Sequence, residues 1–207
     1  MFKLVLEQLR SHAPYTAFGA ATGIIIMAIV VFSGISIKIS QDIFYYLHPI
    51  HVVLSALTTT AMYVKYRGRN IWLVILVGWT GSLGIATISD AIIPFLGADI
   101  LNIPIEFHLP FIEKWWLNLL ALIGVVVGYK WQVTKIPHFG HVLLSTWASL
   151  FYFIGFGKAN WIPLLPFIFL FLFIAVWVPC CTSDIIYPLL FTRRNRKIVS
   201  PAKEANN

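Results

Sequence analysis

The chain has 207 residues, of which 59% are hydrophobic and 11% are charged, and its formal net charge is +7. A typical soluble domain has about 25% charged residues, so this composition excludes a disordered chain, a coiled coil and an ordinary soluble globular domain. Several uncharged stretches have the length of about 20 residues that a helix needs to cross a bilayer, which indicates a helical membrane protein.

Six membrane-spanning helices are predicted along the chain. Five correspond to long uncharged runs, at residues 17–37, 43–64, 71–89, 136–157 and 159–183. The fourth in chain order, at 115–129, is shorter and needs residues 109–112 to reach spanning length. Charged residues interrupt the first sixteen positions, so the first span is expected to be retained rather than cleaved as a signal peptide.

The basic residues predict the orientation of these helices. With six spans, twelve of the fifteen Lys and Arg residues fall on one face of the membrane. Cytoplasmic loops are enriched in Lys and Arg, so both termini are expected in the cytoplasm of a protein integral to the cell or plasma membrane. The basic tail at 193–207 is expected to lie against anionic lipid headgroups. The positive charge is thus explained by the bilayer, and no nucleic-acid partner is expected.

An internal repeat divides the chain into two halves. Residues 48–55 read His-Pro-Ile-His-Val-Val-Leu-Ser, and residues 138–145 read His-Phe-Gly-His-Val-Leu-Leu-Ser. Residues 89–96 read Ser-Asp-Ala-Ile-Ile-Pro-Phe-Leu, and residues 183–190 read Ser-Asp-Ile-Ile-Tyr-Pro-Leu-Leu. Two motifs in the same order favour a duplication over chance similarity between apolar segments.

Each half contains three predicted spans, so the two halves point in opposite directions across the membrane. The chain is therefore predicted to be an all-α polytopic membrane protein, with six transmembrane helices as two inverted-topology three-helix repeats. The repeats cover approximately residues 10–98 and 106–192 of a single membrane domain, 1–207. Each half begins with a GxxxG pair, Gly19 with Gly23 and Gly124 with Gly128. Such pairs allow close helix packing and are candidate faces for a homo-oligomer.

The predicted topology collects all six histidines and two intramembrane aspartates into two sets of metal-ligand type. The outer set comprises His48, His51, Asp90 and His108. The cytoplasmic set comprises His138, His141, Asp184 and His12. The two sets are expected to lie about one hydrocarbon thickness apart, on the order of 20–30 Å.

The chemistry of each set favours a divalent metal ion. Histidines at positions i and i+3, such as His48 and His51, project from one helix face. Three imidazoles with one carboxylate suit zinc or ferrous iron, and a cation removes the cost of an unpaired aspartate in lipid. The adjacent cysteines, Cys180 and Cys181, are expected to be packing thiols, with a soft-metal pair as the alternative.

Three functions fit these residues. The first is a transporter of a divalent transition metal, zinc or iron, with sites near both membrane faces. The second is an electron carrier with two b-type haems, each held by histidines. The third is a membrane hydrolase in which Asp or Ser activates a metal-bound water. The sequence has no phosphate-binding loop and no serine nucleophile elbow, and it leaves open whether the protein is an enzyme.

Overall fold

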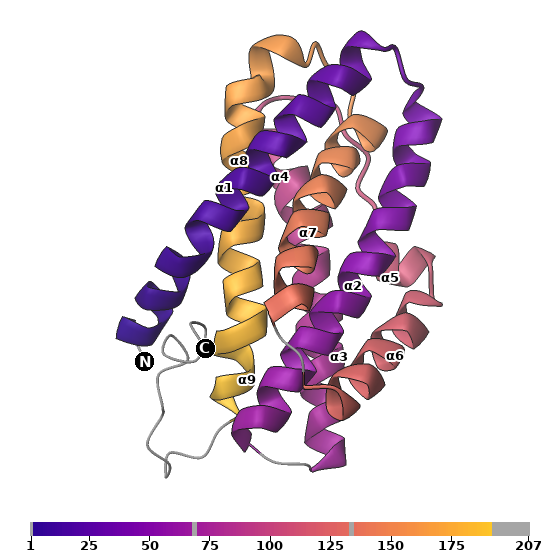
Figure 1. Ribbon diagram of the computed structural model, residues 1–207. Coiled ribbons are helices and arrows are strands. Elements are labelled where there is room, and N and C mark those ends of the chain that lie inside the picture. The colour runs from indigo at the N-terminus through magenta and orange to yellow at the C-terminus, as the bar shows by residue number, and fades with distance from the viewer. Residues whose placement is uncertain (1, 68–69, 133–134, 192–207) are drawn as a thin grey trace.

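The protein was analysed as a computed structural model that describes residues 2–67, 70–132 and 135–191, a range that ends before the basic tail. The described chain is mostly helical and has no β-strand (Figure 1). The long helices are α1 (Phe2–Phe32), α2 (Ile37–Arg67), α3 (Ile71–Thr87), α6 (Leu117–Lys130), α7 (Lys135–Phe156) and α8 (Leu165–Cys181). The short elements are η1 (Ile88–Ile92), α4 (Ile93–Ile100), α5 (Pro110–Glu113), η2 (Ile162–Leu164), η3 (Thr182–Ile186) and α9 (Tyr187–Leu190).

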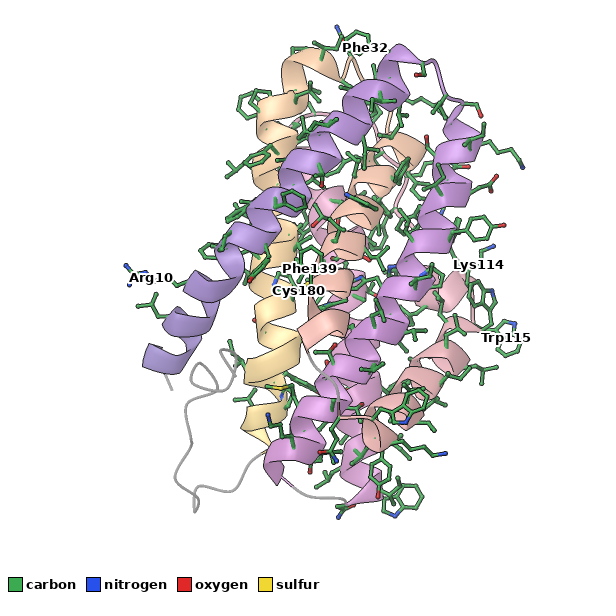
Figure 2. The ribbon with its side chains drawn as sticks, in the orientation of Figure 1. Arg10, Phe32, Lys114, Trp115, Phe139 and Cys180 are labelled. Carbon is green, nitrogen blue, oxygen red and sulfur yellow. The ribbon has the colours of Figure 1, made fainter. Side chains whose placement is uncertain are left out.

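Five stretches of the described helices are long and apolar enough to cross a membrane. They are Ala13–Phe32, Ile37–Lys65, Ile71–Ile100, Phe139–Phe156 and Ile162–Cys180. Large apolar side chains cover the outside of the bundle, and Phe32 and Trp115 point away from it (Figure 2). An exposed apolar surface of this extent is typical of a lipid-facing protein, which supports the predicted membrane class.

The sixth predicted span differs from the expectation. Helix α6 has 14 residues, which corresponds to about 21 Å, whereas the hydrocarbon core is about 30 Å thick. Residues 109–112 do not extend it. Leu109 has an extended backbone, and Lys114 also leaves the helical conformation, at φ −118° and ψ 72°. Pro110–Glu113 therefore form a separate turn of helix, α5, and a sixth full-length span is not confirmed.

Helices α2 and α7 lie side by side at the centre of the bundle (Figure 1). Helix α1 packs on α7 and α8, while α6 packs on α2 and α3. The GxxxG glycines lie at these contacts: Gly19 faces Thr146 of α7, and Gly124 and Gly128 face the backbone of α2. The glycine faces thus pack within one chain, and their use in a homo-oligomer stays a prediction.

One π-helix interrupts the third long helix of each half. Helix α3 continues through η1 into α4, and α8 continues through η3 into α9. In η1 the Ile93 N–H reaches back to the Ile88 carbonyl, which is a π-type bond. A proline follows each π-turn, Pro94 in α4 and Pro188 in α9, and proline cannot donate to the carbonyl four residues earlier. The two Ser-Asp motifs therefore both lie in π-turns, which occur frequently at functional sites.

The start of α1 and the element α9 lie at the same end of the bundle (Figure 1). The orientation of the two termini relative to the membrane, with both in the cytoplasm, stays a prediction.

Candidate metal site at the centre of the bundle

Asp90 is fully buried and accepts hydrogen bonds from four described side chains. Its Oδ2 atom accepts from His48 Nδ1 at 2.8 Å and from His51 Nδ1 at 2.6 Å. Its Oδ1 atom accepts from the Ser89 and Ser145 hydroxyls, each at 2.7 Å. Four donors occupy the acceptor positions of a carboxylate, so we assign Asp90 as ionised. The predicted contact of Asp90 with His48 and His51 is confirmed.

Local structure explains this geometry. His48 and His51 lie one turn apart on α2 and therefore share a face. The π-turn η1 leaves the Ser89 carbonyl available, and Ser149 of α7 donates its hydroxyl hydrogen to it at 2.9 Å. Ser145 lies one turn before Ser149 on the same face of α7. Neither α7 serine was predicted to belong to the site, although Ser145 ends the repeated histidine motif.

His141 of α7 lies beside His51 of α2. Their ring centroids are 5.6 Å apart, and the ring planes differ by 22°. The prediction that these residues belong to sets on the order of 20–30 Å apart is therefore wrong. The histidine motifs were placed at the ends of their spans, because the uncharged runs begin just before them. Helix α2 instead begins at Ile37, so that His51 lies about halfway along it.

Among the described residues, buried side chains form two groups of possible metal ligands. One group is His48, His51 and Asp90, and the other is His51, His141 and Cys180. Within each group, the ligand atoms lie within 4.8 Å of one another. His51 belongs to both groups.

In the first group the histidines are hydrogen-bonded to the carboxylate. Donors bound to a tetrahedral zinc ion at about 2.0–2.3 Å are about 3.3–3.6 Å apart. The hydrogen bonds from His48 and His51 to Asp90, at 2.8 and 2.6 Å, are shorter than this. In this structure the two contacts are hydrogen bonds. His51 bonds to Asp90 through Nδ1, so Nε2 is the atom with which it could serve the group with His141 and Cys180.

His108 does not join this cluster. Its Nδ1 atom pairs with Glu113 Oε1 at 2.8 Å, and its Nε2 atom lies 3.5 Å from Glu106 Oε2. The prediction that His108 lies near Asp90 did not include the aromatic rings that separate His108 from the central site. The Phe156 ring lies 4.4 Å from the His108 ring, and the Phe44 ring stacks on His48 at 5.4 Å.

Glu113 is held by two donors at the bundle surface. The Tyr45 hydroxyl donates to Glu113 Oε2 at 2.7 Å, and the His108 ring contacts the other oxygen. Burial by itself would raise the pKa of Glu113, but these two hydrogen bonds and the charge of a protonated His108 together lower it below its ordinary value. This outer cluster is thus a carboxylate–histidine contact separate from the central site.

Three predicted site residues have side chains outside the described part of the chain. They are His12, His138 and Asp184. Their predicted association with His141 stays a prediction.

Comparisons with known proteins give no match: none of the family models, curated proteins or solved structures searched is similar to this chain. The contacts of His51, Asp90, His141 and Cys180 are therefore the basis for a functional assignment.

Proposed function

We propose that this protein binds a divalent transition-metal ion, zinc or ferrous iron, at a central site and carries it across the membrane. The observation that carries the proposal is the position of His51. It bonds to the Asp90 carboxylate on one side and lies beside His141 and Cys180 on the other. Ionisable side chains buried in a membrane bundle are expensive and are usually functional.

The Asp90–His51 contact supports metal binding in a specific way. A histidine that binds a metal usually donates its second ring hydrogen to a carboxylate, which fixes the ring and makes the ligand nitrogen more basic. His51 has this arrangement, with Nδ1 on Asp90. The two serine hydroxyls on Asp90 hold the carboxylate in turn. Asp90 is thus proposed to orient the ligand rather than to bind the ion itself.

The interrupted helix at the site supports transport. Transporters often bind their substrates where helices are interrupted. Asp90 lies in the π-turn η1, next to His51 about halfway along α2, whereas His141 and Cys180 lie at the ends of the apolar stretches Phe139–Phe156 and Ile162–Cys180. We therefore propose one site at the centre of the bundle in place of two sites near opposite faces.

We further propose that the two halves are inverted repeats that move relative to each other. Equivalent hydrogen bonds that cross between the halves support this. Ser149 of α7 donates to the Ser89 carbonyl in η1 at 2.9 Å. Thr59 of α2 donates to the Ser183 carbonyl in η3 at 3.4 Å. Thr59 and Ser149 are 90 residues apart, which is the offset of the two histidine motifs.

A metal-dependent hydrolase is the second candidate. It is favoured by the presence of three histidines, one aspartate and two serines in one buried region. A general base must accept a proton from the attacking water. The oxygens of Asp90 already accept four hydrogen bonds, which makes Asp90 unsuited to this role. Transport therefore agrees better with the observed contacts.

The haem alternative gains less support. Two histidines that bind one haem lie on opposite faces of the macrocycle and direct a nitrogen at the iron. His51 and His141 instead lie ring to ring, with centroids 5.6 Å apart.

The test combines metal analysis with transport. Purified protein is expected to bind one equivalent of zinc or iron, and proteoliposomes are expected to take up the same ion. His51→Ala and His141→Ala should each abolish binding and uptake. His108→Gln is the matched control, because His108 contacts Glu113 at the surface, and it should retain both. Uptake that persists in the His51→Ala/His141→Ala double variant would overturn the proposal.

A further inference from the structure

Three donor side chains from three different helices lie together next to Asp90. They are His51 of α2, His141 of α7 and Cys180 of α8, and all three are buried. We infer that Cys180 supplies a thiolate ligand to the ion, with His51 and His141 as nitrogen ligands. The site then selects thiophilic divalent ions, zinc and cadmium, over magnesium, manganese and ferrous iron. This inference rests on the proposed function and names its substrate class.

Spacing supports the ligand set. The three donor atoms lie within 4.8 Å of one another, and zinc with one sulfur and two nitrogen ligands needs separations of about 3.3–3.6 Å. Side-chain shifts of about an ångström, within the range of rotamer adjustments on binding, close this difference. The hydrogen bond of His51 to Asp90 already fixes the ring that supplies the nitrogen.

The surroundings of Cys180 are consistent with a buried metal ligand. Cys180 is 3% exposed and packs with Val142 of α7 and Val176 of α8. Figure 2 shows Cys180 on α8 at the level of the first turns of α7, which carry Phe139. The valine contacts place the thiol against α7, on which His141 lies one residue before Val142. The thiol therefore lies on the side of α8 that faces the histidine.

Charge balance favours a divalent ion. A cysteine that binds a metal is deprotonated, so one thiolate and the Asp90 carboxylate together carry two negative charges. A divalent cation cancels these charges, and an uncompensated charge is costly in an apolar bundle. A monovalent ion would leave one negative charge buried.

Donor type decides the selectivity. Thiolate and imidazole ligands favour zinc, whereas magnesium and manganese prefer carboxylate, carbonyl and water oxygens. Ferrous iron binds nitrogen and sulfur sites more weakly than zinc in the general order of divalent ions. With Asp90 held by two histidines and two serines, the group contains no carboxylate ligand. Three protein ligands also leave a fourth position open, which allows the ion to exchange.

The experiment is cobalt substitution followed by optical spectroscopy on the purified full-length chain. Cobalt(II) in this site should show a near-ultraviolet thiolate-to-metal charge-transfer band. Cys180→Ser should remove the band and weaken zinc binding by about 10-fold or more. Cys181→Ser, a matched change at the neighbouring residue, should retain the band and the affinity. Zinc X-ray absorption on the wild type should show one sulfur at about 2.3 Å.

The outcomes separate this inference from the proposed function. A charge-transfer band that persists in Cys180→Ser, or a zinc spectrum without sulfur, overturns the inference, while loss of binding in His51→Ala still supports the central site. A wild-type protein that binds none of these ions overturns both. If Cys180→Ser does not fold, the zinc spectrum of the wild type decides alone. In Cys180→Asp, a shift of preference from cadmium toward manganese supports the inference, and an unchanged preference overturns it.

Discussion

His51 donates its Nδ1 hydrogen to Asp90 Oδ2 across 2.6 Å, and both side chains are buried between α2 and the π-turn η1. This bond sets the tautomer of His51 and directs its Nε2 atom away from Asp90. The remaining contacts of the site follow from this pair, because Asp90 is fixed by two serines and His51 lies against His141.

Replacing Asp90 with Asn should weaken metal binding without removing a ligand. Asn has an NH2 group in place of one carboxylate oxygen. The hydrogens of this group would point at donors that now bond to an oxygen of Asp90. We expect metal affinity to fall by about 10- to 100-fold. Isothermal titration with zinc measures it. Asp99→Asn, the same change at an exposed residue of α4, should have no effect, and an equal loss in both variants would contradict the role given to Asp90.

Replacing Ser145 with Ala should destabilise the fold. The change removes one of two donors to Asp90 Oδ1 and leaves a buried, charged acceptor partly unsatisfied. We expect a loss of about 1–3 kcal/mol in the free energy of unfolding, measured by denaturation in detergent. Ser33→Ala, at an exposed position after α1, should leave stability unchanged.

Replacing Gly124 with Ala should loosen the contact between α6 and α2. A Cβ atom at Gly124 would lie 2.5 Å from the Val53 carbonyl oxygen. Relief of this overlap requires a backbone shift that costs about 1–3 kcal/mol. The control is Gly84→Ala, because nothing lies within 4 Å of a Cβ at Gly84. That change should stabilise α3 by about 0.5–1 kcal/mol. Equal thermal stability of the two variants would contradict the close packing of α6 on α2.

The outer Glu113 contact should make stability depend on acid pH. The pKa of Glu113 is lowered in the folded protein, so its contribution is present above the unfolded pKa of about 4.3. That contribution is lost as the pH falls through the lower folded pKa. Thermal unfolding of the wild type and of Glu113→Gln should therefore differ near neutral pH and converge in acid. Tyr45 and His108 contact the Glu113 carboxylate. The ammonium group of Lys114 lies over the Tyr45 ring. Tyr45→Phe should reduce the difference, and a difference that grows in acid would refute this assignment.

The short helix α6 gives a test of topology. If α6 crosses the membrane despite its 14 residues, Lys114→Cys and Lys130→Cys should react with an impermeant thiol reagent from opposite sides. Lys65→Cys should react from the same side as Lys130→Cys. Labelling of Lys114→Cys and Lys130→Cys from one side would show that α6 does not span the membrane.

Sequence by itself determined the membrane class and two contacts of the site, those of His48 and His51 with Asp90. Uncharged runs of spanning length identify helices because backbone groups in lipid must be satisfied internally. His48 and His51 are one helical turn apart, and a buried Asp90 needs partners. Local periodicity and the cost of buried charge were therefore enough to bring these three residues together.

Only the tertiary structure decided which residues lie on the other side of His51. The positions of His141 and Cys180 depend on the offset of α7 and α8 relative to α2 along the helix axes. No local pattern in the chain encodes that offset. The same holds for the Phe44 and Phe156 rings that separate His108 from the centre. Contacts between helices depend on packing and on where each helix begins. The charge-free runs therefore predicted that the spans exist, but they placed the histidines of α2 at the end of the helix instead of near its middle.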